Sequence, residues 1–441
     1  MANQHIDHAT QADSLTDPRE LRQAVDEVIA ATPIVDMHTH LFAPQFGQMQ
    51  LWGIDELLTY HYLIAELFRS SDVKPARFWE LSKPAQADLI WETLFVRETP
   101  LSEATRGVAA VLSALGLDTR APDLRQAREF FREQRAEGYL DRILEMSRVS
   151  EVVMTNDPFD EGERRIWESQ VAIDPRFHAA LRTDRLLNEW DQAVPQLNAR
   201  GYRVQADLTG GTVNEARRFL AKSIELMRPV YLAVSLPDDF QFPEDSARDR
   251  LIRDVILPAG REYNLPFAMM IGVKRAVNPA LRVAGDGLGR AEIKAVERIC
   301  ADYADNRFLV TMLSRENQHE LCVAARKFSN LMPFGCWWFL NNPSIIDEIT
   351  RERLELLGTR FIPQHSDARI LDQLVYKWRH SRRVIAEALY DAYRQLLADG
   401  RAVTRQEVER DVARLFSENF RDWVGLSAGK AIPEETRSHT N

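Results

Sequence analysis

The chain has 441 residues, of which 45% are hydrophobic and 28% are charged. This composition provides ample material for a core and excludes a chain that is disordered throughout. The formal net charge is −10, and no basic block offsets it. We therefore expect no nucleic-acid partner and no acidic membrane partner, and an anionic substrate would need local arginines.

Cysteine spacing and the length of apolar runs indicate the cellular compartment in which the protein is expected. Cys300, Cys322 and Cys336 have no paired spacing, which predicts neither a disulfide framework nor a cysteine zinc site. Residues 1–15 are polar, and no apolar run reaches the roughly 18 residues of a membrane span. We expect an unexported protein of the reducing cytoplasm.

The first third of the chain is predicted to be mostly helical. Asp17 followed by Pro18 is typical of a helix start, and this helix should run to about Ala31. Residues 1–32 are therefore predicted to be a polar arm and a lead-in helix. An apolar run begins at Pro33. Beyond it, from about residue 55 to about residue 148, apolar side chains recur at helical spacing, which predicts a helical insertion.

The rest of the chain alternates short apolar runs with amphipathic stretches, the pattern of βα units around a parallel sheet. Eight candidate strands result, and they suggest an α/β fold, a (β/α)8 TIM-type barrel over residues 33–427 with the insertion after its first strand. Residues 428–441 are predicted to be a polar tail. The candidate strands are 33–40, 152–156, 178–182, 230–236, 267–272, 308–313, 331–338 and 361–367.

Metal-ligand side chains stand at the ends of the first and last candidate strands. His38 and His40 are two residues apart, so a strand turns both imidazoles to one side. Alone, this pair could be a polar rim without metal. Asp367 ends the eighth strand, which neighbours the first in a closed barrel. We expect these three residues to bind one divalent metal ion, zinc, with open coordination positions.

Six stretches together resemble the uronate isomerase (glucuronate isomerase) family of the amidohydrolase superfamily. The likeness covers about residues 33–424. It implies a barrel with a helical insertion, a small-molecule uronate substrate and interconversion of aldouronates and ketouronates; we also expect a homo-oligomer. The stretches are 36–42 (DMHTHLF), 57–62 (LLTYHY), 177–182 (FHAALR), 313–319 (LSRENQH), 334–338 (FGCWW) and 365–369 (HSDAR).

The chain also departs from the wider superfamily. Candidate strand four, 231–236, offers no lysine for carbamylation, so a two-metal centre is not expected. Strands five and six lack the histidines that related hydrolases place there. Since many uronate isomerases keep a strand-five histidine, the chain resembles a divergent branch.

Three further residues have both a structural and a functional interpretation. Arg369 could form a surface salt bridge or face the pocket beside Asp367. Arg182 ends a strand, where a guanidinium could grip a carboxylate. Tyr62 has the helical spacing of a core residue. The resemblance implies catalytic roles for Asp367, Tyr62 and Arg369 and substrate binding by Arg182.

Other polar side chains near strand ends are secondary candidates. Trp378, Arg315 and His61 are predicted to contact substrate, Trp378 through its indole N–H, although packing is the common fate of tryptophan. His319 and His365 are expected to be structural histidines with satisfied hydrogen bonds.

The leading hypothesis is an aldose–ketose isomerase. It would convert D-glucuronate to D-fructuronate, and D-galacturonate to D-tagaturonate, by moving a proton from C2 to C1 through an enediol. One alternative is a mononuclear metal-dependent hydrolase of a lactone or amide, in which Asp367 activates water. Another is a catalytically silent barrel that binds sugar acids.

Overall fold

The computed structural model describes residues 14–426, so residues 1–13 and the predicted tail 428–441 lie outside the described residues. A capped helix leads the chain into the sheet. The Asp17 carboxylate accepts hydrogen bonds from the backbone N–H groups of Arg19 (2.7 Å) and Glu20 (3.3 Å). With Pro18 in its first turn, α1 (Pro18–Ala31) confirms the predicted helix start.

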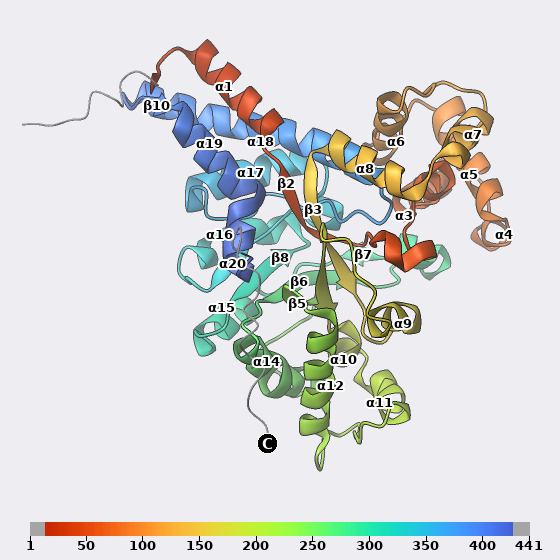
Figure 1. The fold of residues 1–441 in the computed structure, drawn as a ribbon, viewed down its shortest axis with the longest axis vertical. Helices are drawn as coiled ribbons and strands as arrows, with labels where there is room; N and C mark the ends of the chain where they lie inside the picture. Colours follow the sequence, from red (N-terminus) through yellow and green to blue (C-terminus); the bar gives the residue numbers. More distant parts are fainter. Residues whose placement is uncertain (1–13, 427–441) are drawn as a thin grey trace, which may run out of the picture.

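Within residues 14–426, seven parallel strands form one curled sheet, in the order β2-β3-β4-β5-β6-β8-β9 (Figure 1). Seven of the eight predicted strands are confirmed, although the last of them ends earlier than expected. The strands are β2 (Ile34–Thr39), β3 (Val149–Asn156), β4 (Phe177–Arg182), β5 (Tyr231–Pro237), β6 (Phe267–Lys274), β8 (Phe308–Met312) and β9 (Leu331–Pro333). The short strand β7 (Gly287–Leu288) pairs antiparallel with β6, whereas β1 (Ser14–Leu15) and β10 (Val403–Thr404) form a separate two-stranded antiparallel sheet.

The eighth position of the barrel is held by an irregular segment, which we call the closing segment (residues 361–368). The prediction of a regular strand here is wrong. Only Ile362 pairs with the strand before it: its N–H donates to Pro333 O (3.0 Å), and its carbonyl accepts from Gly335 N (2.8 Å). Pro363 follows and has no N–H to continue a ladder.

The other end of the closing segment is attached to the first strand. Asp367 N donates to His38 O (3.2 Å), and His40 N donates to Ala368 O (2.7 Å). Asp367 has a left-handed backbone, with φ of 53°, which aspartate tolerates better than most residues. The fold is therefore the predicted α/β TIM-type barrel, closed between β9 and β2 by hydrogen bonds at the two ends of this segment.

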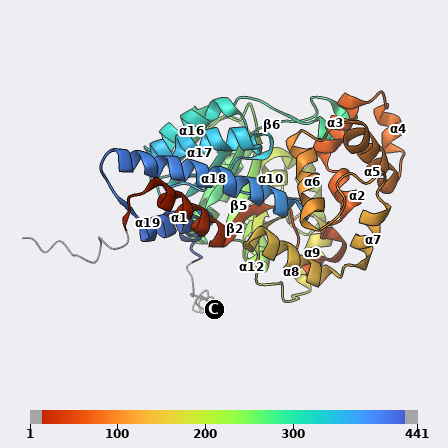
Figure 2. The same ribbon diagram turned by 90° about the horizontal axis from the view of Figure 1, so that it is seen from above.

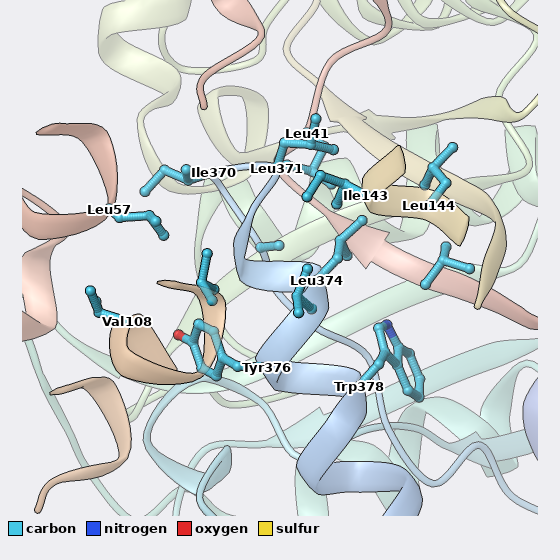
Figure 3. Packing of buried hydrophobic residues seen from close by; sticks show 14 of the residues in the cluster. Leu41, Leu57, Val108, Ile143, Leu144, Ile370, Leu371, Leu374, Tyr376 and Trp378 are labelled. Atoms are coloured by element: carbon cyan, nitrogen blue, oxygen red, sulfur yellow. The ribbon is translucent and has the colours of Figure 1, made fainter. Parts of the chain in front are cut away.

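Helices fill the chain between β2 and β3, and both overall views place them together at one side of the barrel (Figures 1 and 2). Gly107 on one of them lies against the Tyr376 ring, which a Cβ would approach to 2.6 Å. Figure 3 shows Val108 beside Tyr376 in this contact. The helices are α2 (Ile54–Leu58), α3 (His61–Ser70), α4 (Pro75–Trp79), α5 (Lys83–Trp91), α6 (Glu103–Ala114), α7 (Arg125–Glu133) and α8 (Ala136–Ser147).

The remaining helices surround the sheet, and strand alternation separates two cores. In β4, Ala180 faces the core inside the barrel, whereas Ala179 and Leu181 face the surrounding helices. No helix within residues 14–426 is both long and apolar enough to span a membrane. The helices are α9 (Glu161–Glu168), α10 (Asp184–Asn188), α11 (Trp190–Ala199), α12 (Thr212–Met227), α13 (Ala247–Leu251), α14 (Leu257–Glu262), α15 (Ile293–Asp302), α16 (Gln318–Ala325), α17 (Pro343–Leu357), α18 (Gln373–Ala398), α19 (Arg405–Ala413) and α20 (Asn419–Val424).

Candidate metal centre and active site

His38, His40 and Asp367 meet where β2 ends against the closing segment. One ligand atom from each residue lies within 4.8 Å of the other two. Asp367 Oδ1 is 3.8 Å from His38 Nε2 and 3.4 Å from His40 Nε2. The pairing of β2 with β3 shifts register between Asp36 and Thr39, an irregularity of the kind that redirects side chains. The predicted grouping of the three residues is confirmed.

A tyrosine fixes the tautomer of the first histidine. His38 Nδ1 lies 3.0 Å from the hydroxyl oxygen of Tyr231, and that hydroxyl donates its own hydrogen to Met37 O at 2.8 Å. Because the phenol has one hydrogen, its oxygen must accept from Nδ1–H. The lone pair of His38 is therefore on Nε2, which is buried and has no hydrogen-bond partner.

A threonine plays the same part for the second histidine. The Thr155 hydroxyl donates to Thr39 O at 3.0 Å and lies 2.8 Å from His40 Nδ1. It therefore accepts from Nδ1–H, and Nε2 of His40 also presents a lone pair. Both histidines are prepared to act as ligands through the same ring nitrogen.

The three facing atoms are all electron-pair donors. Burial lowers the pKa of His38 to about 3 and that of His40 well below its usual range, so both rings are neutral at physiological pH. Asp367 Oδ1, like His38 Nε2, is buried without a hydrogen-bond partner. Such atoms repel one another unless a cation lies between them, and two imidazoles with one carboxylate fit a divalent ion. In the described part of the chain, no other such group of three or more occurs.

The tyrosine support gives a prediction about metal affinity. Tyr231→Phe removes the acceptor for His38 Nδ1–H and so frees the imidazole to rotate or change tautomer. Loss of such a support typically costs about 10- to 100-fold in affinity. We expect at least a tenfold weaker divalent-ion affinity, measured by competition with a chromogenic chelator. An unchanged affinity would show that the ring is oriented by packing alone.

Asp36 connects the histidine strand to the closing segment. One of its oxygens accepts from Ser366 N (3.0 Å), and the other accepts from the indole N–H of Trp378 (2.8 Å). Trp378 on α18 is only 2% exposed and packs among apolar side chains (Figure 3). This position gives no support to the predicted substrate contact, because the one polar group of the indole donates its hydrogen bond to Asp36.

Two predicted residues come to the site from the insertion. His61 begins α3, and Tyr62 follows it. Burial raises the pKa of Tyr62 well above its ordinary value, and the charge of Asp367 adds to this effect. Burial lowers the pKa of His61 to about 3, and the nearby charge of Arg369 lowers it further. His61 Nε2 is buried without a partner. Both side chains therefore lie within electrostatic reach of Asp367.

Two guanidinium groups flank the triad. Arg182, at the end of β4, uses Nε to donate to Asp184 (3.1 Å), which leaves Nη1 and Nη2 for another acceptor. Arg369 is exposed, and its backbone N–H is held by Gln373 at 2.9 Å. The positive charges of both arginines help to lower the pKa of His40, which places them close to the metal ligands.

The structure does not bring Arg315 into this site. It lies in a short turn after β8, is 55% exposed and forms a two-point ion pair with Glu348 of α17, at 3.0 and 2.8 Å. This position gives no support to the predicted substrate contact, because Glu348 of α17 holds the guanidinium on the protein surface. His319 is likewise exposed and pairs with Glu352.

His365 is a neighbour of the site that sequence reasoning did not place there. It is fully buried, its ring lies edge-on to that of His38 at 5.3 Å, and neither ring nitrogen has a hydrogen-bond partner. The expectation of a satisfied structural histidine is wrong. The ring fits because Gly335 has no side chain: a Cβ there would lie 1.7 Å from His365 Nδ1.

Lys377 is a second unpredicted neighbour. Its side chain is 2% exposed, its Nζ lies 3.6 Å from Glu103 of α6, and it stands over the ring of Tyr62 at 5.6 Å. This buried pair connects α18 of the barrel to the insertion beside the Tyr62 phenol. No sequence signal marks Lys377, since its partner lies 274 positions away.

Comparison with solved structures identifies the family. The chain is 55% identical to a uronate isomerase from Bacillus halodurans C-125, with a TM-score of 0.91 over 93% of this chain and 98% of that one. A uronate isomerase from Thermotoga maritima (16% identity; 92% and 97% covered; TM-score 0.72) shares the fold. So does a glucuronate isomerase from Caulobacter crescentus (16%; 99% and 99%; 0.74). No family model and no curated protein matched.

Identity of 55% over nearly the full length of both chains exceeds what a shared fold alone produces. The match covers 93% of this chain and 98% of the other. The chain is an aldose–ketose isomerase and belongs to the uronate isomerase family.

Proposed function

We propose that the enzyme converts D-glucuronate to D-fructuronate and D-galacturonate to D-tagaturonate. An aldouronate carries a carboxylate at one end and the reacting carbonyl at the other. The observation that carries the proposal is that two guanidinium groups with free donors, on Arg182 and Arg369, flank the triad of His38, His40 and Asp367. Guanidinium donors match a carboxylate in shape and charge.

The proposed reaction moves one proton between adjacent carbons. The base removes the proton from C2, which gives an enediol, and the proton returns at C1; the hydroxyl hydrogen of O2 leaves as O1 gains one. Asp367 is the proposed base. Its Oδ1 is buried and faces the histidines, and the side chain as a whole is 10% exposed.

Tyr62 and Arg369 are proposed to serve the substrate oxygens. Because its pKa is raised well above 10, the Tyr62 phenol stays protonated and can donate a hydrogen bond to the oxygen that gains charge. The guanidinium of Arg369 is two residues from the proposed base and can hold the same oxygens. His61 is proposed to contact substrate from the insertion.

We propose zinc as the native ion, held by His38, His40 and Asp367, because a set of two imidazoles and one carboxylate suits it. When bound, a divalent ion supplies Lewis acidity and a fixed positive charge for substrate oxygens. The protein's own part is to hold both histidines in one tautomer, through Tyr231 and Thr155.

The direct test is product analysis. Purified enzyme is incubated separately with D-glucuronate and D-galacturonate, and the ketose carbonyl is followed by 13C NMR. Ketouronate from either sugar acid, and little product from the neutral sugars glucose and galactose, supports the proposal. Hydrolysis of glucuronolactone without any ketose would instead favour the lactone hydrolase. Binding of uronates without turnover would favour a silent sugar-acid-binding barrel.

Arg182 offers a test of the substrate's charge. Arg182→Met should lower kcat/KM for uronates by at least about tenfold, which corresponds to roughly 1.4 kcal/mol lost from a charge-assisted contact. Arg315→Met is the matched control, because that arginine also follows a barrel strand, β8, but pairs with Glu348 on the surface. The control should keep near-parental kinetics. Equal losses in both variants would remove Arg182 as the specific anchor.

A further inference from the structure

A second basic site lies apart from the active site. A cavity of ≈ 460 Å³ opens between α1, α8 and α18, within the usual size range of small-molecule sites. Its floor is apolar, with Ile29, Val375 and Ala386 each at most 5% exposed. Five arginines line it: Arg22, Arg148, Arg379, Arg382 and Arg383. Asp26 is the one acidic residue among the lining residues.

Within the described residues, only one of the five arginines is neutralised by carboxylates. Arg22 is paired, with Asp26 and Glu387 each at 2.7 Å. Arg382 donates to backbone carbonyls, including Thr32 O at 2.9 Å, and its Nε is buried without a partner. The remaining three, Arg148, Arg379 and Arg383, are exposed and form no ion pair or side-chain hydrogen bond with residues 14–426.

Positive charges crowd one another here in a chain whose net charge is −10. Burial, together with the nearby charge of Arg148, lowers the pKa of Arg382 to about 10. Two guanidinium groups that repel each other across a concave surface would both gain from an anion placed between them. Planar arginine forks suit phosphate and carboxylate oxygens in particular.

This arginine-lined cavity, which we call the groove, is separate from the catalytic site. Ile34 N donates to Arg148 O (3.0 Å) at the start of β2, whereas His38 lies four residues along that strand. At about 3.3 Å per residue, the two sites are roughly 13 Å apart along the strand. Substrate in one site leaves the other accessible.

From these observations we propose that the groove between α1, α8 and α18 binds a small organic oxyanion with at least two negative charges. The negatively charged groups of this ligand contact Arg148, Arg379 and Arg383, and its non-polar part lies on the apolar floor of the groove. Phosphate and carboxylate share this recognition chemistry, so the ligand is a phosphorylated or a polycarboxylated metabolite. This inference does not depend on which uronate the enzyme converts.

The test uses the full chain with two probes, pyrophosphate and citrate, and titration calorimetry against potassium chloride of equal ionic strength. The groove variant is Arg148→Gln/Arg379→Gln/Arg383→Gln. The control is Arg77→Gln/Arg120→Gln/Arg298→Gln, which removes the same charge from exposed arginines on other elements. Isomerase activity should be unchanged in both variants, which reports that the fold and the active site are intact.

We expect the parent and the control to bind at least one probe, and the groove variant to bind it at least tenfold more weakly. Binding of pyrophosphate alone assigns a phosphorylated ligand, and binding of citrate alone assigns a polycarboxylate. Equal binding by all three proteins would overturn the proposal, and so would the absence of saturable binding by the parent. A groove variant that changes oligomeric state while the parent binds neither probe would make this face a contact between copies.

Discussion

Replacement of Asp367 by asparagine is expected to abolish nearly all turnover of uronates while the fold survives. The amide cannot accept the C2 proton, and the loss of a general base commonly costs about 10²- to 10⁴-fold in rate. The fold should persist because Asp367 is anchored through its backbone N–H to His38 O, and asparagine also tolerates a positive φ. Turnover by NMR and thermal unfolding by circular dichroism measure the two effects.

An isotope experiment gives the same prediction a second, independent readout. In D2O, a proton held by a side chain can exchange with solvent, whereas a hydride that passes directly between carbons cannot. The parent enzyme should therefore place some deuterium at C1 of the ketose. A base that is shielded from solvent could return the same proton, so the absence of deuterium alone would not exclude a proton transfer. Absence of deuterium at C1 together with near-parental activity of Asp367→Asn would exclude Asp367 as the base.

Loss of either histidine ligand should have the second largest effect. His38→Ala or His40→Ala removes one of three protein ligands, and two ligands compete poorly with water for a divalent ion. Most of the bound metal should be lost on dialysis, as measured by elemental analysis. His319→Ala is the control, because this exposed histidine pairs with Glu352 on the surface. Full metal occupancy in His38→Ala would place the ion elsewhere.

The sequence predicted the parts of the site that depend on barrel topology. The spacing of His38 and His40, and the position of Asp367 on the last barrel element, were sufficient because the first and last elements of a closed barrel are neighbours. The irregular path of the closing segment was less predictable. Its residues are apolar enough for a strand, and only Pro363 hints that a ladder cannot continue.

Side-chain partners were the part that the sequence could not supply. Trp378 and Arg315 both occupy plausible positions, but Asp36 binds the indole of the first and Glu348 binds the guanidinium of the second. The hydrogen-bond partners of these two side chains come from elements that are far away in the sequence. The tautomer-fixing hydroxyl of Tyr231 was missed for the same reason, since nothing in strand β5 marks it as a partner of β2.

The closing segment also bears on how the enzyme is made. The histidine ligands are synthesised near the beginning of the chain, whereas Asp367 and the backbone groups that hold it follow more than three hundred residues later. A nascent chain on the ribosome therefore exposes only two of the three ligands during most of translation. High-affinity metal capture has to wait until the barrel closes, so acquisition of the ion becomes a late step of maturation that reports on completed folding.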